Sequence, residues 1–190
     1  MSRERVLTRC LDELGRAICY LRALRGIDRA ETYHAVDFIR LSSWALRDQM
    51  FAHVIKVLGK KEEAGFWSLH DSDPDFFADQ CIEQQVSLND IRAVMPKLNK
   101  IRNKTLFHLD RAGVLDPTKV WSDADMTYGQ FEVALNTSFG LLNALHDRLH
   151  GSPYPMPDYD GTDATRLAQM AEADRAANRK TGADAFNSVE

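Results

Sequence analysis

Apolar residues recur every three or four positions along several long stretches of this chain. Because a helix turns by about 100° per residue, this spacing gathers them on one helical face. It predicts helices over residues 3–24, along a stretch that ends at Leu58, and from Thr127 to near Gly151. In the first helix the stripe consists of Val6, Leu7, Cys10, Leu11, Leu14, Ile18, Leu21 and Leu24.

The order of these helices predicts an all-α fold, an up-and-down bundle of four to five main helices with short extra helices and a flexible C-terminal tail. The first helix is expected to close at Gly26, and Asp28 can cap the second. A short turn between two long helices favours an antiparallel pair. Residues 1–151 then form one helical domain. The three prolines of residues 152–157 make a stiff linker to a polar tail, residues 158–190, that is helical or mobile.

The net charge and the cysteines indicate which classes of protein this chain can belong to. The 190 residues carry 24 Lys and Arg against 28 Asp and Glu, a net charge of −4, which argues against a general DNA coat or a membrane-surface protein. The three cysteines lack metal-ligand spacing and are expected to be reduced thiols. With no signal peptide and no membrane-spanning run in view, we expect a cytoplasmic protein.

The stretch from Leu98 to Arg111 predicts the main part of one helix. We expect this helix to start at Ser87 and to end near Gly113, with a kink or an interruption at Pro96. Arg102 lies at the edge of its apolar stripe, roughly 40° from Leu98. An unpaired charge beside a buried stripe is costly, so Arg102 needs a carboxylate, an anionic ligand or a partner subunit. The stripe itself consists of Leu98, Ile101, Thr105, Leu109 and Ala112.

Positive charge gathers around the same stretch, although the chain as a whole is acidic. A local cluster of this kind attracts phosphate groups. The cluster consists of Arg92, Lys97, Lys100, Arg102, Lys104 and Arg111.

The sequence Arg102-Asn103 followed by His108 resembles the motif of the HEPN superfamily (higher eukaryotes and prokaryotes nucleotide-binding), most closely its abortive-infection U-type (AbiU-like) branch. The resemblance implies a metal-independent endoribonuclease of a toxin–antitoxin or abortive-infection system, without a cofactor and with RNA as its partner. Arg102 would stabilise phosphate charge, Asn103 would assist, and His108 would act as base or acid. Lys97, Lys100, Lys104 and Arg111 would bind RNA. A neutralising antitoxin is a further partner to expect.

Assembly as a homodimer is also expected. Arg102 and His108 lie roughly 120° apart on one helix and cannot both face a shallow surface of one copy. Two copies related by a two-fold axis can pool them in a shared cleft. Asp37 and Asp48 are candidates to line that cleft.

Other interpretations stay open. Arg102 can pair with an internal carboxylate while His108 caps the helix end. The whole chain can then be a non-catalytic helical module that binds a partner protein or a nucleotide. Metal sites are weaker hypotheses, because Glu31-x-x-His34 has no second copy for a di-iron site and the His146–His150 pair lacks a third zinc ligand.

Overall fold

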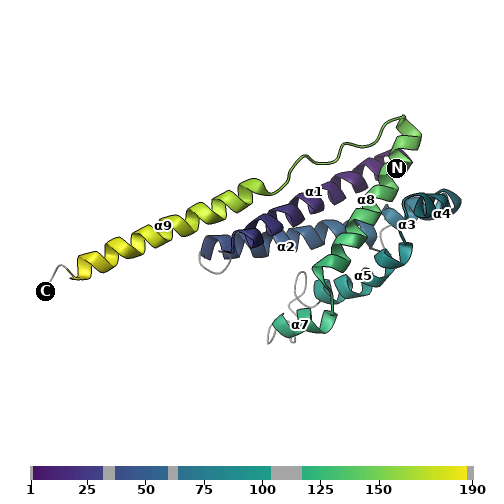
Figure 1. The fold of residues 1–190 in the computed structure, drawn as a ribbon. Coiled ribbons are helices and arrows are strands. Elements are labelled where there is room, and N and C mark those ends of the chain that lie inside the picture. The colour runs from purple at the N-terminus through teal and green to yellow at the C-terminus, as the bar shows by residue number, and fades with distance from the viewer. Residues whose placement is uncertain (1, 32–36, 60–63, 104–116, 188–190) are drawn as a thin grey trace. The chain divides into compact units, whose positions relative to one another are not determined.

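A computed structural model describes residues 2–31, 37–59, 64–103 and 117–187 of the chain (Figure 1). Within these ranges the protein consists of helices and contains no strand, which confirms the all-α fold. None of these helices is long and apolar enough to cross a membrane. They are α1 (Arg3–Arg29), α2 (Asp37–Leu58), α3 (Phe66–Asp71), α4 (Pro74–Glu83), α5 (Leu88–Ile101), α7 (Pro117–Ala124), α8 (Tyr128–His150) and α9 (Thr162–Asn187).

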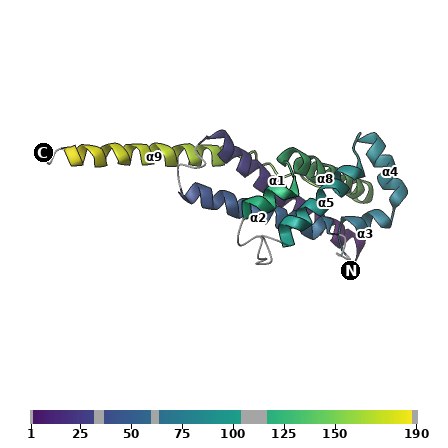
Figure 2. The same cartoon turned by 90° about the horizontal axis from the view of Figure 1, so that it is seen from below.

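The chain divides into two compact units, and α1 and α2 contribute to both. The larger unit contains Met1–Ile18 and Phe51–Pro157, and the smaller unit contains Cys19–Met50 and Asp158–Glu190. In the larger unit α5 packs against α8 and α7, and α4 packs against α8 and α3 (Figures 1 and 2). The motif helix of the sequence analysis is α5, so it lies within this larger unit.

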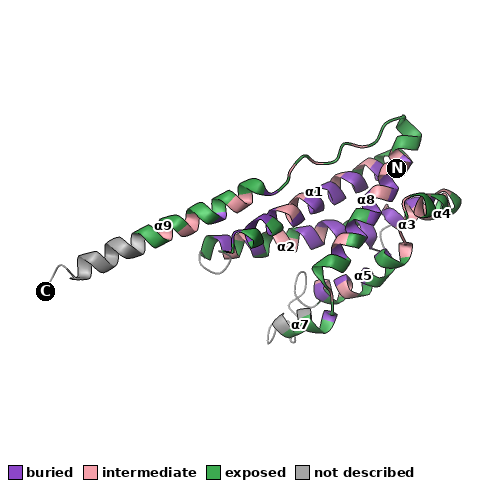
Figure 3. Ribbon diagram, viewed as in Figure 1, coloured by how far each residue is buried: buried purple, intermediate pink, exposed green. Residues whose placement is uncertain are grey.

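Aromatic and aliphatic side chains fill the core of the larger unit. Phe51 meets Phe131 edge-to-face with their ring centroids 5.0 Å apart, and Phe66 meets Phe77 in the same way at 5.6 Å. Such pairs add to the free energy gained from burying the rings. Figure 3 shows the buried residues along α1, α2 and α8.

The predicted helix caps are present. The Ser87 hydroxyl accepts from the backbone N–H of Asn89 at the start of α5, and Thr127 forms a reciprocal capping box with Gln130 at the start of α8. Gly151 ends α8 in the left-handed conformation, with φ of 69°. The expected interruption at Pro96 is wrong, because α5 continues through it. Pro96 is exposed, so water can reach the carbonyl that loses its helical donor there.

The predicted end of the first helix at Gly26 is also wrong, since α1 continues to Arg29 and includes Asp28. Gly26 instead permits a close approach within the smaller unit. A Cβ atom on Gly26 would lie 2.2 Å from the carbonyl oxygen of Gly161, which itself has a φ of 82°. The Thr165 hydroxyl donates to the Gly26 carbonyl at 2.8 Å. The glycine therefore serves a long-range contact and not a helix end.

The proline linker and the first turns of the segment after it make specific contacts. Tyr154 exchanges hydrogen bonds with the Asn143 side chain in the larger unit, and α9 begins at Thr162 in the smaller one. Ala168 of α9 is completely buried with Ile27, Ala30 and Ile39. Alanine side chains contribute little apolar area, which explains why the polar composition hid this docking.

Replacing Gly26 with Ala should lower the free energy of unfolding by about 1–3 kcal/mol, because the added methyl group forces the backbone near Gly161 to move. Urea unfolding followed by circular dichroism measures the change. Gly129→Ala is the matched control, since the nearest atom to its new Cβ lies 3.9 Å away. An unchanged Gly26→Ala protein would contradict the close approach.

Candidate nucleic-acid interface

Arg102 and Asn103 follow directly after α5, where the helix widens into a π-type turn. The backbone N–H of Arg102 donates to the carbonyls of Leu98 and Asn99. Leu98 and Ile101 are fully buried, Arg102 is half-buried, and Asn103 is exposed. Arg102 thus lies at the border of the buried stripe, where the sequence placed it, and π-type turns are frequent at functional sites.

Three of the predicted site residues are Lys104, His108 and Arg111, and these lie outside the described residues. The same holds for the predicted helix end near Gly113 and for His34 of the Glu31-x-x-His34 pair. The described part of the candidate site is therefore Lys97, Lys100, Arg102 and Asn103.

Lys97 and Lys100 bind backbone carbonyls at the end of α7. The Lys100 ammonium donates to the Asp123 carbonyl at 2.7 Å. Lys97 donates to the Asp125 carbonyl and, at 3.0 Å, to the side-chain oxygen of Gln130. The last carbonyls of a helix have no partner within it, and cations near them are favoured by the helix dipole. Both lysines therefore help to fix α7 against α5, a role that the sequence did not reveal.

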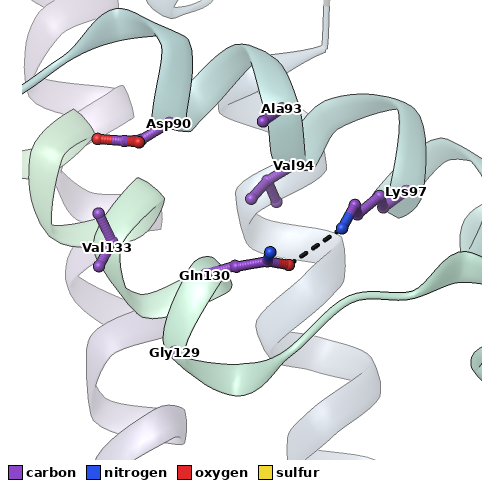
Figure 4. Close-up of a pocket in the computed structure, with 7 residues that line it drawn as sticks. All are labelled: Asp90, Ala93, Val94, Lys97, Gly129, Gln130 and Val133. Carbon is purple, nitrogen blue, oxygen red and sulfur yellow. Dashed lines mark hydrogen bonds between the residues drawn. The ribbon is translucent and has the colours of Figure 1, made fainter.

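A small pocket of about 250 Å³ lies between α5 and α8 (Figure 4). Its walls include Asp90, Val94 and Lys97 from α5, and Gln130 and Val133 from α8. In Figure 4 the Lys97 ammonium points toward the Gln130 amide across one side of this pocket. Drug-sized ligands usually occupy roughly 300–1,000 Å³, so the pocket is small for a nucleotide.

The acidic residues expected to line a shared cleft have arginine neighbours on their own helix. Asp37 forms an ion pair with Arg40 at 2.8 Å, and Asp48 lies 3.7 Å from Arg47. Burial raises the pKa of Asp48, and the nearby Arg47 opposes that rise.

The histidine pair at the end of α8 does not form a metal site among the described residues. The rings of His146 and His150 lie 4.3 Å apart, and His146 donates from Nδ1 to the Ser152 carbonyl at 2.9 Å. No group of three potential protein ligands gathers in the part of the chain that the structure describes. A zinc site requires at least three such ligands.

A buried polar cluster in the larger unit was not predicted. The Glu13 carboxylate on α1 accepts from Nδ1 of His53 on α2, and both side chains are buried. Lys56 lies 3.5 Å from the same carboxylate, and Arg9 contacts it from the exposed side of α1. Two features of the sequence could have indicated this cluster. Glu13 lies one turn after Cys10, near the apolar stripe, and His53 lies between the apolar Phe51 and Val54.

Opposing effects set the pKa of Glu13. Burial raises it, but the hydrogen bond and charge of His53, together with Lys56 and Arg9, lower it below its usual value. Burial and the Glu13 charge raise the pKa of the neighbouring Cys10 to about 11, so this thiol stays protonated and is a poor nucleophile. Because the Glu13 and His53 side chains are buried, we assign the cluster to stability and not to catalysis.

Comparison of the chain with protein-family models, curated proteins and solved structures found no match in any of the three.

Glu13→Gln should lower the free energy of unfolding by roughly 3 kcal/mol at pH 7, because it removes the charged acceptor of a buried hydrogen bond. The folded-state pKa of Glu13 is lowered, so its stabilisation is complete above its unfolded pKa of about 4.3. It is lost as the pH falls through the folded-state pKa. Urea unfolding of both proteins between pH 7 and pH 3 should therefore show the difference shrinking toward acid.

The exposed Glu4 on the same helix supplies the control. Glu4→Gln should change stability by less than about 1 kcal/mol at every pH, since Glu4 is exposed and the helix dipole favours its charge only weakly. A Glu13→Gln effect that stays constant with pH would show that the carboxylate is not the stabilising species.

Proposed function

We propose that this protein is a metal-independent endoribonuclease of the HEPN type, acting as a toxin or in abortive-infection defence. The supporting observation is the position of Arg102 and Asn103 at the end of α5. Arg102 is half-buried at the border of the fully buried stripe, and the exposed Asn103 follows it in the sequence. A cation positioned in this way suits an anionic group such as phosphate.

In this proposal the ribose 2′-hydroxyl attacks the adjacent phosphorus atom, and His108 removes the hydroxyl proton or protonates the leaving oxygen. The new 2′-oxygen–phosphorus bond forms as the bond to the 5′-oxygen breaks. The products are a 2′,3′-cyclic phosphate and a free 5′-hydroxyl. Arg102 stabilises the negative charge that the phosphate gains in the transition state, and Asn103 orients the phosphate.

The remaining cations divide into two groups in this scheme. Lys104 and Arg111 are proposed to contact the RNA backbone directly. Lys97 and Lys100 donate to carbonyls of the α7 end, so they support the position of α5 and add positive potential near the RNA.

The same lysine contacts favour a second candidate, a helical module that binds a protein or nucleotide without cleaving RNA. If the positive cluster exists mainly to hold α7, its charge needs no nucleic acid to explain it. A cleavage assay separates the two candidates, because binding alone leaves the RNA intact.

His108→Ala should slow RNA cleavage by roughly 10²- to 10⁴-fold, the usual contribution of a positioned acid or base. Cleavage by the unchanged protein should persist in EDTA and leave 2′,3′-cyclic phosphate ends. Sequencing the fragments of total RNA with end-specific ligation measures both the rate and the end chemistry. Arg102→Ala should produce a comparable loss.

Arg16→Ala is the matched control, since Arg16 is an exposed cation on α1 away from the proposed site. It should leave cleavage unchanged. Full cleavage by a folded His108→Ala protein would exclude His108 as the acid or base. Intact RNA with every variant, including the unchanged chain, would leave the binding module as the better explanation.

A further inference from the structure

Helix α9 packs against the rest of the smaller unit through alanine side chains, while Leu167 and Met170 of the same helix are exposed. Ala168 is completely buried, and Ala164 and Ala171 are half-buried beside it. Leu167 and Met170 are 61% and 67% exposed. The alanines contribute little apolar burial to this contact, and most of the Leu167 and Met170 side chains stays exposed. Covering the outer face would bury this remaining apolar surface.

An apolar groove of about 380 Å³ lies next to this face, within the smaller unit. Ile27 of α1, Ile39 and Leu46 of α2, and Ala164 and Leu167 of α9 contribute to its walls. Phe38 stands at its edge and is 73% exposed. The same surface thus carries an apolar groove and, beside it, the exposed Phe38 and Leu167 side chains, which are of a kind that fills such a groove.

The exposed apolar surface continues around α2 beyond the groove. Leu41 and Trp44 are both exposed, and the Arg40 guanidinium lies 5.5 Å from the Trp44 ring centroid. A small molecule in the groove would leave this surface and Met170 uncovered. Extended exposed apolar surface of this kind marks contact with another protein.

We propose that a second copy of this chain covers the surface, with the two α9 helices antiparallel across a two-fold axis near Met170. A two-fold interface uses the same patch on both copies, so the patch must complement itself. A groove flanked by projecting Phe38 and Leu167 meets this condition, because each copy offers a side chain to the groove of the other. A different protein could bind through the groove alone or through the exposed side chains alone, so it would not require both on one surface.

The charged residues of α9 favour an antiparallel arrangement of the two α9 helices. At about 100° per residue, Leu167, Met170 and Asp174 share a stripe that Arg166 borders. With Met170 at the centre, Arg166 stands four residues before it and Asp174 four residues after it. An antiparallel pair therefore places Arg166 of each copy opposite Asp174 of the other, twice. A parallel pair would place like charges together, which is unfavourable.

Both charged residues are available to such a contact. Arg166 and Asp174 are exposed. Asp174 already has an interaction within its own chain, and a carboxylate can accept from further donors through its two oxygens. The proposal does not rest on Arg102, His108 or RNA cleavage, and it concerns a contact on the smaller unit, whereas the motif helix belongs to the larger one.

A charge-swap series on the full chain tests the proposal by sedimentation equilibrium. Arg166→Asp and Asp174→Arg should each raise the dimer dissociation constant by roughly 10- to 100-fold, because each creates two like-charge contacts. The double variant Arg166→Asp/Asp174→Arg restores opposite charges and should recover most of the affinity. Gln169→Asp, an exposed substitution about 100° around the helix from Met170, is the control and should change little.

Crosslinking supplies a second measurement, which reports where on α9 the two copies meet. In a Cys19→Ser/Cys81→Ser background, Met170→Cys should form a disulfide-linked dimer on mild oxidation, whereas Gln169→Cys should not. Circular dichroism checks that each variant stays helical. A monomer at all concentrations, a dimer insensitive to both single charge reversals, or a double variant that fails to recover would overturn the proposed interface.

Discussion

Burial of the apolar stripe of α1 is the constraint on which both units depend. Leu7, Leu11 and Leu14 are fully buried in the larger unit, and Leu24 and Ile27 are buried in the smaller one. Burying each such side chain contributes about 1.5–3 kcal/mol. Because the stripe runs the length of the helix, α1 contributes apolar side chains to the core of both units.

Several charged side chains lie beside this apolar packing and are compensated by nearby polar groups. Glu13 interrupts the stripe of α1 and is compensated by His53, Lys56 and Arg9. Lys97 and Lys100 meet the carbonyls at the end of α7. The two lysines, which the sequence analysis assigned to RNA binding, thus have structural partners. Arg102, at the border of the buried stripe, is the cation on which the proposed chemistry depends.

The two units join their helices through different kinds of side chain. The larger unit encloses the rings of Phe51, Phe66 and Phe131. The smaller unit joins α9 to the chain through alanines and leaves Phe38 and Met170 exposed. The exposed Phe38 and Met170 belong to the apolar surface that the proposed dimer would bury.

The sequence alone determined the helical class, the starts of α5 and α8, the cap at Gly151 and the border position of Arg102. Each of these depends on residues within a turn or two of one another, so local spacing and capping chemistry suffice. It did not determine the continuation of α1 through Gly26, the Glu13–His53 pair or the roles of Lys97 and Lys100. Only the tertiary structure decided these, because the contacts join residues 23 to 139 positions apart, and their partners exist only once the helices have packed.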